Sequence, residues 1–160
     1  ERTRSKKGRY WVLILAPSFG KGDMNMKVGK YFDESEFACK CGNHGFHEDG
    51  TPCLDHVIDK RLVDLLDAIR ERLGVPVYIL SGYRCPTHNA EVGGVSNSQH
   101  VLGTAADITY DGIDVDYLAN LAEECASEVL GEGIGIGRYY FQDFVHVDVR
   151  GYDARWNDLD

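Results

Sequence analysis

The sequence predicts an α+β fold in which helices pack on a small, mainly antiparallel sheet. Two segments repeat apolar residues at helical intervals, and strand-like segments lie between and after them. The last two strand-like segments are close enough along the chain to form a hairpin. With 160 residues the chain fits one domain that can bury its own core.

The two predicted helices cover residues 55–73 and 114–130. In the first, apolar residues recur at steps of one, three and four positions, Asp55 is a suitable N-cap, and Gly74 ends the helix. The second helix has one apolar face, which includes Cys125 as a small core residue. Both helices therefore have a face that must be covered by another layer.

Four segments have the pattern of strands: residues 77–80, 105–110, 133–140 and 144–150. We expect the first to be a buried strand and the last two to pair as a hairpin. The alternating glycines of Gly133–Gly137 lack the spacing of a phosphate-binding loop, so we interpret them as strand positions where another group approaches closely. Residues 85–98 are rich in turns, with one helical turn expected near Asn89.

Charge is divided unevenly along the chain. Residues 1–30 contain eight Lys or Arg and two Asp or Glu, whereas the remainder contains nine basic and 24 acidic side chains. We interpret residues 1–30, with a strand-like run at Trp11–Leu15, as a basic arm or added strand, and residues 31–160 as the folded domain. The arm is either solvated or contacts an anionic polymer or membrane surface. The acidic domain should repel nucleic acid.

No apolar run approaches the roughly 20 residues of a membrane-spanning helix, and no signal peptide is evident. The chain begins at Glu1 and not at Met, so we expect it to be a processed or truncated product.

The chain has five cysteines: Cys39, Cys41, Cys53, Cys85 and Cys125. The first three lie near His44 and His47, but the Cys-x-Cys spacing is one residue shorter than the usual zinc knuckle, so disulfides or free thiols are favoured over a second zinc site. Cys85 with His88 could act as a thiol nucleophile, although no third orienting residue is evident. A disulfide or packing role is the preferred interpretation of Cys85.

Three residues in the second half of the chain suit a catalytic zinc site: His100, Asp107 and His146. Small residues between His100 and Asp107 allow close backbone packing. Around His146 the sequence alternates strictly, which places His146 and Asp148 on one face of a strand. Such neighbouring polar side chains are costly unless they are solvated or have a function.

Three segments resemble the zinc D-alanyl-D-alanine carboxypeptidase family of peptidoglycan peptidases: SGYRCPTHN, SQHVLGTAAD and FVHVDVRG. The resemblance covers about Phe32 to Trp156, and the family motif Ser-x-His-x-x-Gly-x-Ala-x-Asp is matched at every fixed position between Ser98 and Asp107. It implies a Hedgehog/DD-peptidase-like fold. It also implies one Zn²⁺ held by His100, Asp107 and His146.

The resemblance further implies two catalytic residues. Asp143 stands three residues before the last histidine, where many relatives have Glu, and would be the general base. Arg84 would lie near the scissile carbonyl and stabilise its oxyanion. Asp148 either orients a zinc ligand or is a surface carboxylate. Two further residues would line the substrate groove: Tyr83 and Asn89.

The function implied is hydrolysis of a peptide bond in peptidoglycan stem peptides, by a D-alanyl-D-alanine carboxypeptidase. The alternatives are an endolysin-like L-alanyl-D-glutamate endopeptidase, a non-catalytic zinc module such as the Hedgehog signalling domain, and a thiol hydrolase using Cys85. We expect a monomer that acts outside the cytoplasm or at the cell wall. Its basic arm, residues 1–30, would contact an anionic wall polymer.

Overall fold

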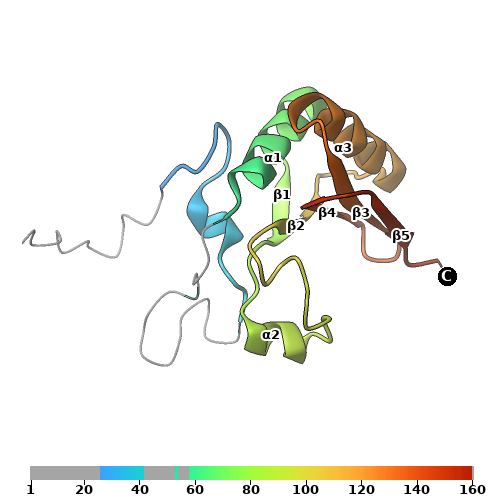
Figure 1. Cartoon of the computed structure of the whole chain (residues 1–160). Helices are drawn as coiled ribbons and strands as arrows, with labels where there is room; N and C mark the ends of the chain where they lie inside the picture. The colour runs from blue at the N-terminus through green and yellow to red at the C-terminus, as the bar shows by residue number, and fades with distance from the viewer. Residues whose placement is uncertain (1–25, 42–52, 54–57, 160) are drawn as a thin grey trace, which may run out of the picture.

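The computed structural model describes residues 26–41, 53 and 58–159. Its five-stranded sheet has the order β1-β2-β4-β3-β5, and α1 and α3 pack together against it (Figure 1). A one-turn 3-10 helix at Glu34–Phe37 precedes these elements: α1 (Lys60–Leu73), β1 (Tyr78–Ser81), α2 (Pro86–Glu91), β2 (Ala105–Thr109), α3 (Val115–Val129), β3 (Gly133–Tyr139), β4 (Phe144–Gly151) and β5 (Ala154–Asn157). The predicted α+β class is confirmed.

The first predicted helix begins later than expected. Asp59 has an extended backbone with ψ of 126°, and its carboxylate accepts a hydrogen bond from the backbone N–H of Arg61. The helix therefore begins at Lys60, and the predicted start at residue 55 is wrong; Asp55 itself lies outside the described residues. Its predicted end is confirmed by Gly74, which has a left-handed backbone with φ of 76°.

The sheet is mainly antiparallel, as predicted. β3 and β4 form the expected hairpin, and β2 pairs with both β1 and β4 in antiparallel register. β5 was not predicted and pairs with β3 in parallel. The strand predicted at residues 77–80 is present as β1, but the prediction that it is buried is wrong, because β1 is an edge strand that leaves Tyr78 and Leu80 more than 40% exposed.

Alternation along β4 assigns the two faces of the sheet. The side chains of Val145, Val147 and Val149 are buried in the core with α1 and α3. His146 and Asp148 point to the opposite face, which is covered by the loop that leads into β2. The apolar face thus holds the helices, and the polar face is free to build a site.

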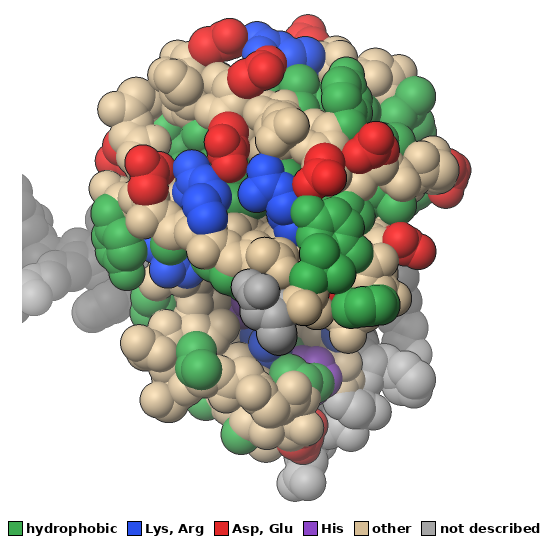
Figure 2. Space-filling model, turned by 90° about the vertical axis from the view of Figure 1, so that its right-hand side faces the viewer, with side chains coloured by type: hydrophobic (Ala, Val, Ile, Leu, Met, Phe, Trp, Pro, Cys, Tyr) green, Lys and Arg blue, Asp and Glu red, His purple; other side chains and the backbone are tan. Residues whose placement is uncertain are grey.

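Figure 2 shows acidic and basic side chains interspersed over the upper part of one face of the molecule, with histidine visible below them. Ion pairs connect α3 with the sheet: Arg138 Nε lies 3.2 Å from Asp116, and Arg155 Nε lies 2.8 Å from Glu123.

Within the described part of the chain, no helix is long and apolar enough to cross a membrane.

Part of the predicted basic arm contacts α1. The backbone N–H of Lys30 donates to Asp67 at 2.6 Å, and its ammonium lies 2.6 Å from Glu71. The strand-like run at residues 11–15 lies outside the described residues, as do His44 and His47.

Candidate metal centre

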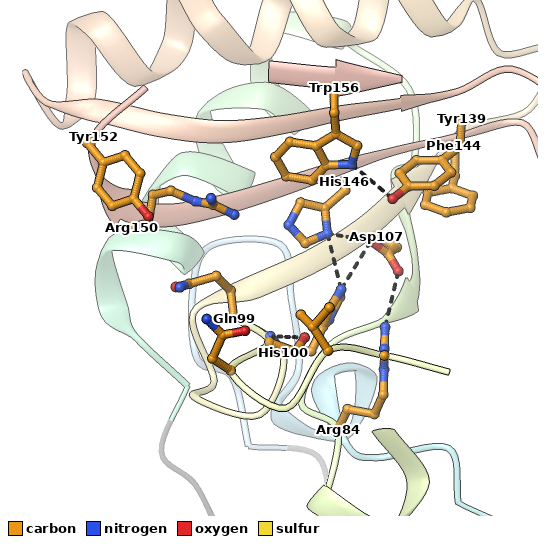
Figure 3. Close-up of a pocket in the computed structure, with 14 residues that line it drawn as sticks. Arg84, Gln99, His100, Asp107, Tyr139, Phe144, His146, Arg150, Tyr152 and Trp156 are labelled. Carbon is orange, nitrogen blue, oxygen red and sulfur yellow. Dashed lines mark hydrogen bonds and ion pairs between the residues drawn. The ribbon is translucent and has the colours of Figure 1, made fainter. Parts of the chain in front are cut away.

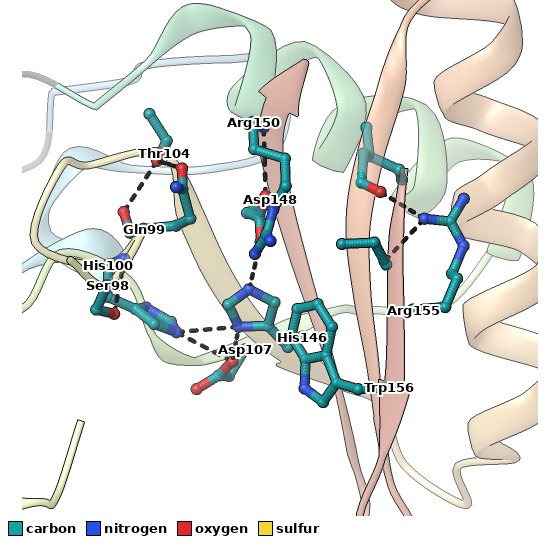
Figure 4. Close-up of polar contacts among 12 residues, drawn as sticks. Ser98, Gln99, His100, Thr104, Asp107, His146, Asp148, Arg150, Arg155 and Trp156 are labelled. Carbon is teal, nitrogen blue, oxygen red and sulfur yellow. Dashed lines mark hydrogen bonds and ion pairs between the residues drawn. The ribbon is translucent and has the colours of Figure 1, made fainter. Parts of the chain in front are cut away.

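Two of the predicted zinc ligands lie side by side on neighbouring strands. Asp107 on β2 and His146 on β4 are direct partners in the antiparallel register, so their side chains share one face of the sheet. His100 comes from the loop before β2, which is fixed by a hydrogen bond from Thr104 Oγ1 to the Gln99 carbonyl at 2.9 Å (Figure 4).

The three side chains direct one donor atom each toward a common point. His146 Nδ1 lies 2.9 Å from Asp107 Oδ1, and His100 Nε2 lies 3.2 Å from both of these atoms. Ligands at zinc–nitrogen and zinc–oxygen distances are separated by about 3.4 Å in a tetrahedral site. All three residues are buried. The spacing and chemistry of this group therefore fit a zinc ion.

The outer nitrogen of each histidine ring is committed as a hydrogen-bond donor. His100 Nδ1 lies 2.8 Å from the Gly82 carbonyl oxygen, and His146 Nε2 lies 2.8 Å from Asp148 Oδ2. A carbonyl or carboxylate oxygen can only accept, so each outer nitrogen carries the hydrogen. The inner nitrogens, His100 Nε2 and His146 Nδ1, are then available as lone pairs for a metal.

The carboxylates at the site are stabilised in their charged form. Burial alone would raise the pKa of Asp107, but the interactions that His100 and His146 make with its carboxylate when their rings are protonated outweigh burial and hold that pKa below its ordinary value. For His146 the two effects have the opposite directions. Burial would lower its pKa, but Asp107 and Asp148 outweigh burial and raise it. The group thus has a high affinity for positive charge, and zinc would compete with a proton for it.

Asp148 is completely buried beneath the site. It accepts hydrogen bonds from His146 and from Arg150, whose Nε and Nη2 lie 2.7 and 2.6 Å from its two oxygens (Figure 4). Burial would raise the pKa of Asp148, but the bonds from Arg150 and His146 lower it to about 2. Of the two interpretations from sequence, the structure supports an orienting carboxylate and excludes a surface one.

The three predicted zinc ligands, His100, Asp107 and His146, line a pocket of about 540 Å³ (Figure 3). Trp156 and Tyr139 border it from the sheet, and Arg84 faces them from the loop after β1. Glycines on β3 allow Asp148 and Trp156 to pack directly against this strand. A Cβ on Gly135 would lie 2.2 Å from Asp148 Oδ2, and one on Gly137 would lie 2.4 Å from Trp156 Nε1. The predicted close approach along Gly133–Gly137 is confirmed.

Arg84 lines this pocket. Its Nη2 lies 3.7 Å from Asp107 Oδ2, and its Nη1 donates to Asn89 Oδ1 at 3.1 Å. Asn89 and Tyr83 were expected to line the groove, but both are buried and neither borders the pocket. Asn89 instead supports Arg84 from behind, because its Nδ2 is also bonded to the Val95 carbonyl at 2.8 Å.

Asp143 lies in the turn between β3 and β4, with a left-handed backbone at φ 54°. Its carbonyl accepts a hydrogen bond of 2.8 Å from Thr109 Oγ1, and its side chain is exposed. It is not among the residues that border the pocket. Its assignment as general base stays a prediction from the position three residues before His146.

Sequence reasoning missed Arg150 as part of this site. The signal was available, because the alternation that places His146 and Asp148 on one face of β4 also places Arg150 there. Its guanidinium lies 5.3 Å from the Trp156 ring and 5.5 Å from the Tyr152 ring. Arg150 is therefore held between an ion pair and two aromatic rings at the pocket wall.

The thiol-hydrolase alternative finds no support in the geometry. The ring of His88 lies 3.5 Å from Glu91, whereas its backbone N–H, not its ring, approaches Cys85 Sγ. Cys125 is buried on α3, as predicted.

We expect Asp148→Asn to weaken zinc binding at this site by about 10- to 100-fold, the usual effect of removing a partner that orients a ligand. An amide can turn its NH₂ group toward His146 Nε2 and favour the wrong ring tautomer. The measurement is zinc affinity by competition with a chromogenic chelator. Asp153→Asn, a change at an exposed carboxylate, is the control. An unchanged affinity in Asp148→Asn would show that Asp148 does not orient the ligand.

Known proteins resemble this chain in sequence. A sequence model of the peptidase M15 family matches residues 30–148. The zinc D-Ala-D-Ala carboxypeptidase of Streptomyces albus G is 35% identical over 92 residues, which cover 57% of this chain and 34% of that protein. The chain thus spans about a third of this relative's length. The solved L-Ala D-Glu endopeptidase of Serratia marcescens aligns with a TM-score of 0.45 at 20% identity, over 57% of this chain and 80% of that one.

Proposed function

The chain belongs to the peptidase M15 family, and from this premise we propose that it is a zinc-dependent hydrolase of a peptide bond in peptidoglycan stem peptides. The observation that carries the proposal is the convergence of His100, Asp107 and His146 at the floor of an open pocket. Three protein ligands with space beside them are typical of a catalytic zinc, whereas structural sites are closed by a fourth ligand.

When bound at these residues, zinc would act as a Lewis acid that activates water and polarises the scissile carbonyl. The residues around it have separate tasks. Asp148 holds the His146 ring in the required tautomer through Nε2, and the Gly82 carbonyl does the same for His100 through Nδ1. Asp143 would accept the proton of the attacking water at its carboxylate and then deliver that proton to the nitrogen of the leaving amine.

Arg84 supplies positive charge on the opposite side of the pocket from the sheet (Figure 3). It extends from a short segment between β1 and α2, and Asn89 fixes its guanidinium. A fixed donor fork of this kind can stabilise the negative charge that develops on the carbonyl oxygen in the transition state.

We expect Arg84→Ala to lower kcat by about 10²- to 10³-fold with little change in KM, because an interaction made only in the transition state affects kcat. Arg84→Lys should recover part of this loss, since it keeps the charge but not the fork. The assay is steady-state kinetics on a defined stem peptide, with Arg72→Ala on α1 as the control. If KM rises while kcat is unchanged, Arg84 instead anchors a substrate carboxylate.

We assign the D-alanyl-D-alanine bond as the one cleaved. The support is a second guanidinium group at the pocket wall, that of Arg150, in addition to that of Arg84, which we assign to the oxyanion. A carboxypeptidase substrate ends in a carboxylate beside the scissile bond, and a planar guanidinium is suited to hold it. The M15 relative from Streptomyces albus G carries this activity in its name.

The experiment that tests the proposal is digestion of purified peptidoglycan and mass spectrometry of the muropeptides. Loss of one terminal alanine residue identifies the carboxypeptidase, whereas separation of the stem peptide after its first alanine identifies the endopeptidase. A chain that holds zinc at the three ligands and leaves all muropeptides intact would be a non-catalytic module.

We propose in addition that the protein acts outside the cytoplasm as a monomer, with residues 1–30 in contact with an anionic wall polymer.

A further inference from the structure

A second group of potential metal ligands lies outside the pocket. It consists of four cysteines whose Sγ atoms are all within 4.8 Å of one another: Cys39, Cys41, Cys53 and Cys85. Three of the four are buried, and Cys41 is half-buried. We call this group the four-cysteine cluster, and we propose that it binds a structural zinc ion, separate from the zinc of the peptidase site.

The arrangement of the sulfur atoms supports a metal over disulfides. Four thiolates around one zinc, with bonds of about 2.3 Å, are separated from each other by about 3.8 Å. Two disulfides would instead draw the atoms into two pairs at about 2.05 Å. A mutual separation below 4.8 Å for all four atoms fits a single centre. A set of four sulfur ligands in this geometry is typical of zinc.

Backbone N–H groups point at the sulfur atoms, as they do around metal-bound thiolates. The N–H of Cys85 lies 3.3 Å from Cys39 Sγ, and the N–H of His88 lies 3.4 Å from Cys85 Sγ. Such donors stabilise negative charge on sulfur and fix its direction. The N–H of Cys39 donates to the Cys53 carbonyl at 3.2 Å, which joins these two ligands through the backbone as well.

The position of the cluster indicates what the zinc would do. Residues 38–41 follow the 3-10 helix and have no regular secondary structure, yet Cys39 lies against Cys85 at the start of α2. The N–H of Tyr83 donates to the Phe37 carbonyl at 2.7 Å, and a Cβ on Gly82 would lie 2.7 Å from the Phe37 backbone. Zinc at the cluster would fasten this segment to Cys85, which directly follows Arg84 of the pocket.

The cluster could be recognised only in three dimensions. From the sequence, a zinc site at Cys39, Cys41 and Cys53 with two nearby histidines is less favourable than disulfides or free thiols, and Cys85 is assigned to a disulfide or to packing. In the structure Cys85 completes the set, although it stands 32 positions after Cys53. The fourth ligand is thus a sulfur from the segment that follows β1.

The test is metal content of the full chain, purified under reducing conditions, by elemental analysis. We expect two zinc ions per wild-type chain, one in Cys41→Ala, one in His146→Ala and two in Cys125→Ala, the control at a buried cysteine outside the cluster. Cobalt(II) added to metal-free His146→Ala should give the intense near-ultraviolet band of thiolate-to-cobalt charge transfer. That variant keeps all four cysteines, so it tests the cluster even if Cys41→Ala does not fold.

The proposal is overturned if the wild-type chain holds a single zinc ion that His146→Ala removes. It is also overturned if the intact mass under non-reducing conditions is lower by the four hydrogens of two disulfides. Because each site is removed by its own variant, failure of the cluster and failure of the peptidase site give different results.

Discussion

His146→Ala should remove zinc from the peptidase site and abolish hydrolysis of stem peptides. His146 contributes the inner nitrogen that lies closest to Asp107 Oδ1, and it is the residue through which Asp148 acts on the site. Its loss leaves two protein ligands, which is fewer than the three that hold a catalytic zinc. The buried carboxylate of Asp148 would also lose the hydrogen-bond donor, His146 Nε2, that compensates its burial.

The same substitution should separate zinc-dependent stability from intrinsic stability. A ligand that binds only the folded chain stabilises it by about 4 kcal/mol when its free concentration is about 1,000 times Kd. Adding zinc to the metal-free protein should therefore raise Tm in the wild type, and part of that rise should be absent in His146→Ala. His88→Ala, which removes a ring bonded only to Glu91 among the described residues, is the control. Full zinc content and an unchanged rate in His146→Ala would refute the ligand assignment.

Asp143→Asn should lower kcat by about 10²- to 10⁴-fold while zinc remains bound, the usual effect of losing a positioned acid–base group. Asn is the informative replacement, because it tolerates the left-handed backbone that Asp143 adopts at φ 54°. Asp143→Ala would add backbone strain to the loss of the carboxylate. Asp143→Glu should retain part of the activity, since Glu keeps the carboxylate that accepts the proton.

Kinetics and zinc content must be measured together on these variants. Asp111→Asn, a change at an exposed carboxylate of a neighbouring loop, is the control. Loss of zinc in Asp143→Asn would identify Asp143 as a structural residue or a ligand. A rate equal to that of the wild type would show that another group accepts the proton. Either result would contradict the role proposed for Asp143.

The sequence by itself determined the elements whose pattern is local. Apolar periodicity predicted α1 and α3, because the repeat reflects which side chains face the core, and two strand-like segments close together along the chain predicted the β3–β4 hairpin. Alternation also indicated that His146 and Asp148 share a face of β4. The zinc ligands came from the resemblance to a family motif, and the structure brings all three together.

Other features were decided by contacts between segments that are far apart in the sequence. A four-residue strand such as β1 can be central or at an edge, and only the strand order left it exposed. From the sequence alone the carboxylate of Asp148 could be solvated, and it is buried because β3 packs against it at Gly135. Cys85 joins the four-cysteine cluster because Tyr83 pairs with Phe37 through the backbone. Local periodicity reports only whether a side chain faces inward, whereas the chain topology determines which group it meets there.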